Sequence, residues 1–252
     1  MSSVSGPNRP LGGICGPRKG KRMKFYGFQK MTLLDYPGKV ACTVFTGGCN
    51  FRCPFCHNAL LVTQLNPADA ISDTEILTYL KKRQGLLDGV CVTGGEPLLW
   101  KELPAFLAEV KSLGYAVKLD TNGSFPETLK ALVREKLVDY AAMDIKNSPE
   151  KYALTAGLDS IELEAVGESI RFLLEEHIPY EFRTTVTEEF HTVEDIRKAA
   201  EWIRGAEAYF LQGFVDSGNV IGGTLHPQPK EVMEQMREAA AAFVPSVTLR
   251  GV

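Results

Sequence analysis

Hydrophobic and polar positions along the chain of 252 residues follow two alternating patterns. Short runs of β-branched and other apolar residues are typical of buried strands. Between them lie longer segments in which apolar residues recur every three or four positions, which is the period of an amphipathic helix. The runs predict six strands, at residues 39–46, 89–93, 115–123, 140–146, 180–186 and 206–214.

Local signals mark several of the intervening helices. Ser72 and Glu75 form the pattern of a capping box, and Gly114 is a typical helix stop. The pair Ser148 and Pro149 suits an N-cap followed by the first helical position. The helical period predicts helices after Ser72 and over 103–110, 126–136, 166–174, 192–204 and 229–243.

Strands that alternate with helices imply a parallel sheet. An open doubly wound sheet and a barrel both fit this order, and six units fall short of the eight in a complete TIM barrel. We therefore expect an α/β fold with a curved, incomplete (β/α)6 TIM-like barrel. The pattern alone leaves the open sheet as an alternative.

The composition bounds the class of protein. Hydrophobic residues make up 44% of the chain, enough for one sizeable core, and the net charge of -3 gives no reason to expect a nucleic-acid partner. The sequence has no secretory signal and no run of about 18 apolar residues, so we expect a cytoplasmic protein that does not cross a membrane. Residues 1–22 are basic and rich in Gly, Pro and Ser, and we expect a disordered, dispensable extension before a domain at 23–252.

Polar residues gather at the ends of the predicted strands. Because the carboxyl ends of parallel strands meet at one edge, sites in parallel α/β folds form there. Charged groups are rarely buried without a partner, so core packing does not explain this shared position. The candidate site residues, in chain order, are Cys49, Cys53, Cys56, Gly94, Gly95, Glu96, Asp120, Thr121, Asn122, Asp144, Lys146, Arg183, Thr184, Thr185 and Gln212.

Three cysteines, Cys49, Cys53 and Cys56, lie within eight positions and are followed by His57. In a reducing compartment, clustered cysteines indicate metal ligands more readily than disulfides. The residues from Cys53 to His57 match the haem-attachment pattern C-x-x-C-H, but that use leaves Cys49 without a role. A zinc site of Cys₃His type is a better match, yet neighbours such as Cys56 and His57 seldom both bind one small ion.

An iron–sulfur cluster is a larger target, because each cysteine of the C-x₃-C-x₂-C motif can bind a different iron. Iron–sulfur cubanes usually take four thiolates, and a fourth is missing nearby. Cys42 and Cys91 lie inside predicted strands and are typical of small buried hydrophobes, whereas Cys15 lies in the extension. Three thiolates leave one iron open, as a catalytic metal site needs and a structural one avoids.

The spacing of Cys49, Cys53 and Cys56, with the aromatic Phe55 before the last of them, resembles the motif of radical S-adenosylmethionine (SAM) enzymes. The resemblance implies one [4Fe–4S] cluster whose open iron is chelated by the amino and carboxylate groups of SAM. It implies that one electron from the cluster cleaves SAM to a 5′-deoxyadenosyl radical, while the protein binds, orients and shields the cofactors. Phe55 and His57 are then expected to flank the cluster and the adenosine.

Three further motifs carry the resemblance. TGGEP at 93–97 resembles the GGE motif, in which two glycines let the ligand approach the backbone and the glutamate accepts from the methionine ammonium. DTNG at 120–123 and MDIK at 143–146 resemble motifs of glycyl-radical-enzyme activases. The matches imply a methionine site at Gly94, Gly95 and Glu96, a position near SAM and a monovalent cation for Asp120 and Asp144, and a carboxylate-binding role for Lys146.

The stretch GFQKMTLLDYPGKVACTVFTGGCNFRCPFCHN, at 27–58, is similar to the opening of activating proteins for anaerobic ribonucleoside-triphosphate reductase. That family implies an incomplete barrel whose open side admits a partner's glycine loop, abstraction of a hydrogen atom from that glycine, and a flavodoxin- or ferredoxin-like electron donor. Two alternatives remain open. One is a radical SAM enzyme acting on another glycyl-radical enzyme, such as pyruvate formate-lyase, or on a small molecule. The other is a non-catalytic zinc or electron-transfer module.

Overall fold

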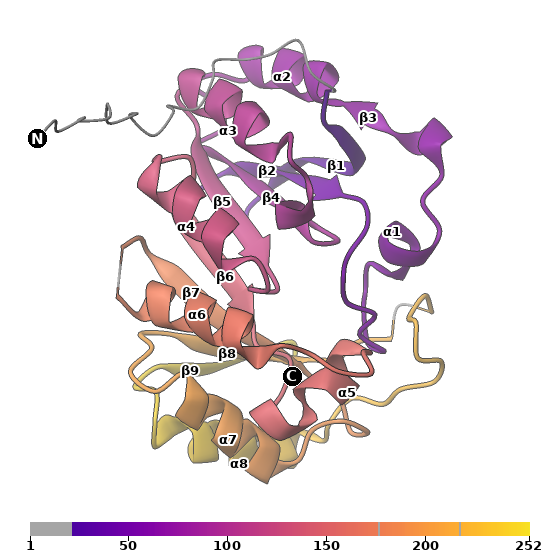
Figure 1. The fold of residues 1–252 in the computed structure, drawn as a ribbon, viewed down its shortest axis with the longest axis vertical. Coiled ribbons are helices and arrows are strands. Elements are labelled where there is room, and N and C mark those ends of the chain that lie inside the picture. The colour runs from indigo at the N-terminus through magenta and orange to yellow at the C-terminus, as the bar shows by residue number, and fades with distance from the viewer. Residues whose placement is uncertain (1–21, 176, 217) are drawn as a thin grey trace, which may run out of the picture.

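The strands of the computed structural model form one curved sheet (Figure 1). The structure describes residues 22–175, 177–216 and 218–252, so the extension expected at 1–22 lies, except for Arg22, outside the described residues. The strand order is β3-β1-β2-β4-β5-β6-β7-β8-β9. The strands are β1 Lys24–Thr32, β2 Ala41–Thr46, β3 Ile71–Ser72, β4 Gly89–Gly94, β5 Ala116–Thr121, β6 Tyr140–Asp144, β7 Tyr180–Val186, β8 Tyr209–Gly213 and β9 Val247–Arg250.

All six predicted strands are present, and each pairs in parallel with the next, as β2, β4, β5, β6, β7 and β8. In the described part of the chain, β3 and β9 are the two edges of the sheet, so the barrel is incomplete. The helices α2, α3, α4, α6, α7 and α8 follow one another around one face of the sheet in Figure 1, whereas a doubly wound sheet carries helices on both faces. The predicted incomplete barrel is therefore confirmed over the open sheet.

Three strands were missed by the sequence pattern, namely β1, β3 and β9. In β1, which pairs antiparallel with β2, only Phe25 and Thr32 are buried, and the register shifts twice along the pair. β3 has only two residues. In β9, buried and exposed positions do not alternate, because three of its four residues are half-buried. These strands are defined by their partners in the sheet, so a hydrophobic period does not reveal them.

The helices lie close to the predicted segments and are capped as the sequence suggests. The Ser72 hydroxyl accepts from the Glu75 N–H at 3.2 Å, and Thr192 and Asp195 form a second capping box. Ser148 and Pro149 begin a short 3₁₀ turn rather than an α-helix. The helices are α1 Ala59–Thr63, α2 Asp73–Lys81, α3 Leu103–Ser112, α4 Pro126–Arg134, α5 Tyr152–Ala156, α6 Leu163–Leu174, α7 Val193–Trp202 and α8 Lys230–Ala241, with 3₁₀ turns η1 Pro67–Asp69, η2 Pro97–Leu99 and η3 Pro149–Lys151.

The two faces of the sheet differ in polarity, because successive side chains along a strand point to opposite sides. One row of residues that pair across β2, β4, β5 and β6 is fully buried in the apolar core between the sheet and the helices: Val44, Val92, Leu119 and Ala141. The next row belongs to the other, concave face and is mostly polar: Thr43, Cys91, Lys118 and Tyr140. The core thus lies between sheet and helices, and the concave face carries the polar residues.

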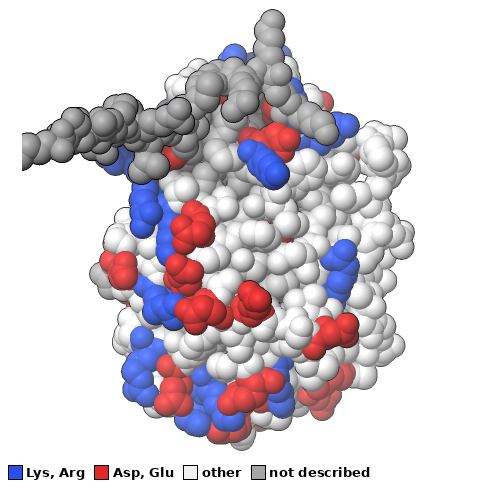
Figure 2. Space-filling model, in the orientation of Figure 1, with Lys and Arg blue, Asp and Glu red and all other residues white. Residues whose placement is uncertain are grey.

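The exterior shows no dominant charge on the face in Figure 2, where basic and acidic side chains are interspersed along the helical side and the lower end. This mixture agrees with the small net charge of -3. Among the described residues, no helix combines the length and the apolar character that crossing a bilayer requires.

The contact between α3 and β1 offers a test of the core. Phe106 is 2% exposed, and its ring lies 4.7 Å from that of Phe25. Phe106→Ala should lower the free energy of unfolding by about 3–5 kcal/mol, because it leaves a cavity in a packed core. Leu86→Ala is the control, because the Leu86 side chain is 64% exposed. Chemical denaturation of both variants should show that this substitution changes the stability by less than about 0.5 kcal/mol. Equal effects of the two substitutions would contradict this packing.

Candidate active site

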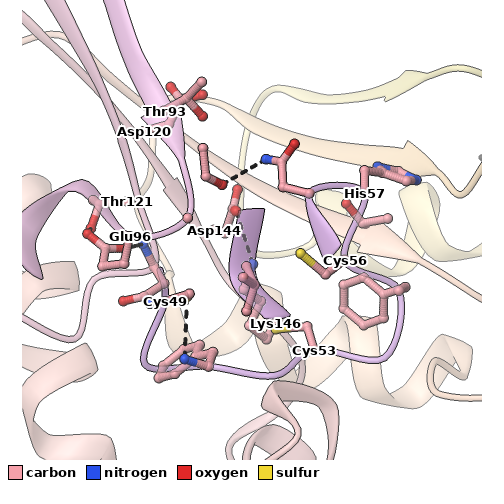
Figure 3. Close-up of a pocket in the computed structure, with 18 of the residues that line it drawn as sticks. Cys49, Cys53, Cys56, His57, Thr93, Glu96, Asp120, Thr121, Asp144 and Lys146 are labelled. Atoms are coloured by element: carbon pink, nitrogen blue, oxygen red, sulfur yellow. Dashed lines mark hydrogen bonds and ion pairs between the residues drawn. The ribbon is translucent and has the colours of Figure 1, made fainter. Parts of the chain in front are cut away.

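A cavity lies at the carboxyl ends of the parallel strands, under the loop at 47–58 (Figure 3). The convergence predicted from the sequence is found, since the lining includes Cys49, Cys53, Phe55, Cys56, His57, Gly94, Gly95, Glu96, Asp120, Thr121, Asn122, Asp144, Lys146, Arg183, Thr185 and Gln212. Thr184 is the exception among the strand-end residues. Its hydroxyl lies 2.6 Å from both the Ile145 carbonyl oxygen and the Tyr209 hydroxyl, and it does not line the cavity.

The loop that carries the three cysteines is held to the rest of the molecule by backbone hydrogen bonds. The Gly48 N–H donates to the Leu61 carbonyl at 2.8 Å, and the Arg52 N–H donates to the Ala156 carbonyl at 2.8 Å. On its other side, the Pro54 carbonyl accepts from the Gly222 N–H at 2.8 Å. The loop is therefore fixed at its beginning and in its middle by α1, by the end of α5 and by the segment after β8.

The thiols of Cys49, Cys53 and Cys56 line the cavity and are protonated in this environment. Burial raises the pKa of all three, that of Cys53 to about 12, although the nearby Lys146 ammonium lowers the pKa of each. No three His, Cys, Asp or Glu side chains among the described residues are arranged to hold a single metal ion. A cubane presents a different iron to each thiolate, so it does not need the thiols to meet at one point.

Phe55 and His57 take different positions beside the cysteines. Phe55 is buried and packs against the rings of Phe190 and His191, at centroid distances of 6.3 and 5.8 Å. The His57 ring is stacked on Phe214 at 5.5 Å, with only 9° between the ring planes, and its Nε2 lies 3.0 Å from the carbonyl oxygen of Val215. His57 is thus engaged with the segment after β8.

The two glycines of TGGEP are required by the chain itself. A Cβ on Gly95 would lie 1.8 Å from the Gly48 carbonyl oxygen, and a Cβ on Gly94 would lie 2.4 Å from the Thr46 nitrogen. The Gly95 and Glu96 N–H groups donate to the carbonyls of Thr46 and Gly48, at 2.9 and 2.8 Å. The group that closely approaches Gly95 in the structure is the backbone at the start of the cysteine loop, and the approach of a ligand to these glycines stays a prediction.

Glu96 is 1% exposed and is the N-cap of η2. Its Oε1 accepts from the Leu98 N–H at 3.1 Å and from the Thr121 hydroxyl at 2.9 Å, and its Oε2 accepts from the Asn122 N–H at 2.7 Å. Burial raises the pKa of Glu96 to about 7, although these hydrogen bonds oppose the rise. The carboxyl group therefore titrates close to neutral pH.

Ion pairs fill the centre of the concave face. The Arg183 guanidinium lies between two carboxylates, with Nη1 3.2 Å from Asp120 Oδ2 and Nη2 2.9 Å from Asp144 Oδ1. Lys146 Nζ lies 3.0 Å from Asp144 Oδ2, and Lys118 pairs with Asp120. Burial would raise the pKa of Asp144, but Arg183 and Lys146 lower it to about 2, and the pKa of Asp120 is also lowered. Both carboxylates stay charged at neutral pH.

The same contacts bear on the monovalent cation expected near Asp120 and Asp144. The Arg183 side chain supplies a fixed positive charge between the two carboxylates. Burial would lower the pKa of Arg183, but these carboxylates raise it above its ordinary value, so the guanidinium stays charged. A monovalent cation at this place stays a prediction, and it would share the carboxylates with Arg183.

Sequence reasoning missed three residues that support the site. Lys118 is 2% exposed, and its spacing of two from Asp120 on one strand was a usable signal for a shared face. Asn58 donates from Nδ2 to the Gly94 carbonyl at 2.7 Å. The buried His191 accepts from the Thr187 N–H at Nδ1, so its Nε2–H donates to the Lys146 carbonyl at 2.9 Å. No local pattern links His191 to Lys146, which is distant in the chain.

Comparison with known protein families identifies the superfamily of this chain. A family model described as the radical SAM superfamily matches residues 43–203. The chain belongs to the radical SAM superfamily. It is accordingly an enzyme whose cofactors are a [4Fe–4S] cluster and SAM, as its sequence motifs implied.

Proteins similar to this radical SAM enzyme include activating enzymes and a synthase. A Methanocaldococcus jannaschii protein named as a glycyl-radical enzyme activating enzyme is 28% identical over 240 residues, which cover 89% of this chain and 94% of that protein. The pyruvate formate-lyase-activating enzyme of Staphylococcus aureus is 30% identical over 132 residues, covering 48% and 52% of the two chains. The 7-carboxy-7-deazaguanine synthase of Thermococcus kodakarensis is 27% identical over 184 residues, covering 66% and 70%.

Solved structures support the fold of the radical SAM domain. A domain of pyruvate-formate lyase-activating enzyme from Bacteroides vulgatus superposes with a TM-score of 0.53 at 22% identity, covering 65% of this chain and 99% of that one. Streptococcus suis SuiB bound to S-adenosylmethionine superposes with a TM-score of 0.59 at 15% identity, covering 82% and 49%. At these identities the likeness concerns the fold alone.

The residues present fit both cofactors. Of the described cysteines, only Cys49, Cys53 and Cys56 line the cavity, whereas Cys42 and Cys91 are fully buried in strands. The remaining lining includes polar side chains of both charges, which suit the ammonium and carboxylate groups of an amino acid. A cluster short of one thiolate and an amino-acid ligand can therefore occupy one cavity.

Removing the guanidinium tests the charge pairing at the site. Arg183→Met should leave Asp120 and Asp144 without their shared partner and lower the free energy of unfolding by about 3–5 kcal/mol, because it breaks a buried ion pair. Arg197→Met is the matched control, since Arg197 is more exposed and pairs with Glu194 and Glu201 on α7. Its unfolding midpoint should stay close to that of the wild type, because ion pairs between exposed side chains contribute little to stability. Equal unfolding midpoints for the two variants in urea would contradict the pairing.

Proposed function

We propose that this radical SAM enzyme generates a glycyl radical on a partner enzyme. The observation that carries the proposal is the similarity to the M. jannaschii protein named as a glycyl-radical enzyme activating enzyme, which extends over 94% of that protein. The DTNG and MDIK segments support it, because the residues that resemble activase motifs, Asp120, Asp144 and Lys146, all line the cavity.

In this proposal Cys49, Cys53 and Cys56 hold the [4Fe–4S] cluster. Binding would release the thiol protons, which burial retains in the free protein. Once bound, the cluster and SAM supply the electron and the 5′-deoxyadenosyl radical. The ring of Phe55 excludes water from one side of the cysteine loop, and Asn58 ties that loop to the Gly94 carbonyl.

Glu96 and Lys146 are proposed to bind the methionine end of SAM. Among the hydrogen bonds of the described residues, Glu96 Oε1 accepts two and Oε2 accepts one, so Oε2 keeps a position for an ammonium donor. Burial would lower the pKa of Lys146, but the Asp144 carboxylate raises it above its ordinary value. Lys146 therefore keeps its proton and can donate to a carboxylate.

The partner that we favour is an anaerobic ribonucleotide reductase, because residues 27–58 are similar to the opening of its activating proteins. A carbon radical abstracts a hydrogen atom only from a group in contact with it, so the partner must bring its glycine to the cavity. A flavodoxin- or ferredoxin-like protein is the proposed electron donor.

A second candidate is a radical SAM reaction on a small molecule. The observation in its favour is the 27% identity to 7-carboxy-7-deazaguanine synthase, which covers 70% of that enzyme. The two candidates differ in the acceptor of the radical, since an activase must leave a stored radical on a protein.

The proposal is tested by anaerobic reconstitution, reduction, and mixing with SAM and purified candidate partners. We expect 5′-deoxyadenosine by chromatography and a glycyl-radical signal by electron paramagnetic resonance (EPR) with anaerobic ribonucleotide reductase. Cys53→Ser should give neither signal, because it lacks a cluster ligand. If 5′-deoxyadenosine forms without a protein radical on either the reductase or pyruvate formate-lyase, the activase proposal fails and the small-molecule reading gains support.

The role of Glu96 has its own test, which is SAM binding to the oxidised cluster by equilibrium dialysis. Glu96→Gln should weaken binding roughly tenfold to a hundredfold, because a hydrogen bond to a charged group contributes about 1.5–3 kcal/mol. Since burial raises the pKa of Glu96 to about 7, the wild-type affinity should rise as the pH increases to about 7, as the carboxylate forms. The variant should lose this rise.

Glu127→Gln is the control, since its side chain is 79% exposed on α4, and its affinity and pH profile should match those of the wild type. A Glu96→Gln variant that binds SAM with wild-type affinity at pH 7.5 would show that the ammonium is held elsewhere.

A further inference from the structure

Asn122 lies between the cysteine loop and the residue proposed to bind the methionine ammonium. Its backbone N–H donates to Glu96 Oε2 at 2.7 Å. Its side-chain Nδ2 lies 3.8 Å from Cys49 Sγ and 2.9 Å from Asn50 Oδ1. One residue, 5% exposed, therefore contacts both a thiol of the loop and Glu96.

The orientation of the Asn122 amide is determined by its neighbours. Its Oδ1 accepts from the Ser124 backbone N–H at 3.0 Å and from the Ser124 hydroxyl at 2.6 Å. A backbone N–H is only a donor, so the atom facing it must be the oxygen. The NH₂ group consequently faces Cys49 and Asn50. The Asn50 amide is held in turn, because its Nδ2 donates to the Ser124 hydroxyl at 2.9 Å.

We infer that Asn122 is a positioning residue whose amide donates a hydrogen bond to the Cys49 thiolate and thereby raises the reduction potential of the bound cluster. The inference rests on the proposed function, in that Cys49 must be a cluster ligand. Hydrogen bonds to the sulfurs are one of the factors that set the potential of an iron–sulfur cluster. A donor stabilises the extra negative charge of the reduced state, so its removal makes reduction harder.

A second donor to Cys49 is unaffected by a change at Asn122. The Phe51 N–H lies 3.3 Å from Cys49 Sγ, and it belongs to the backbone of the loop. The bond from the Asn122 N–H to Glu96 is also a backbone bond. Truncating the Asn122 side chain thus removes one donor to sulfur and keeps the hydrogen bond that holds Glu96.

The experiment is an EPR-monitored redox titration of reconstituted protein. Asn122→Ala is expected to lower the ratio of reduced to oxidised cluster about tenfold at a fixed potential, which corresponds to about 59 mV for one electron. Asn66→Ala is the matched control, because the exposed Asn66 side chain accepts from the Ala68 N–H and does not line the cavity, and the potential of this variant should equal that of the wild type.

An unchanged potential in Asn122→Ala, or an equal shift in Asn66→Ala, would overturn the inference. Asn122→Ser is the second variant, and loss of the cluster from both Asn122 variants would also overturn it, since Asn122 would then be needed for assembly. Failure of the wild type to assemble a [4Fe–4S] cluster is a different result. It would reject the proposed function, and the potential comparison would have no cluster to report on.

Discussion

Charged side chains on the concave face of the sheet must be paired, and the candidate site depends on how that pairing is achieved. Asp120 and Asp144 end neighbouring strands and would repel each other, but the Arg183 guanidinium lies between them. This arrangement lets the sheet present carboxylates and the Lys146 ammonium to one cavity without an unpaired buried charge. The apolar core remains on the opposite face, between the sheet and the helices.

Two parts of the chain are locked together at the edge of this cavity. The glycines after β4 are small enough for the start of the cysteine loop to pass directly over them, and the Glu96 N–H donates to the Gly48 carbonyl. Asn58 fastens the end of the loop to the same turn. These hydrogen bonds hold the loop that carries the three thiols against the turn that carries Glu96.

The sequence predicted much of this site because its signals are local. Strand periodicity placed the polar residues at a common edge, and the cysteine spacing with the GGE, DTNG and MDIK segments pointed to one cavity. What it could not predict depends on contacts across the sheet. The bridging position of Arg183 requires the register of three strands, and β1 is defined by pairing with β2. The close approach of Gly48 to Gly95 likewise joins residues far apart in the chain.

The central claim is that SAM completes a cluster held by only three thiolates. Electron–nuclear double resonance on the reduced, reconstituted enzyme tests it directly, with SAM labelled by ¹⁵N in the amino group and ¹⁷O in the carboxylate. We predict hyperfine coupling of both labels to the cluster, and loss of the cluster signal when Cys53 is replaced by serine. Absence of coupling from either label, with a [4Fe–4S] cluster present and SAM bound, would contradict the account.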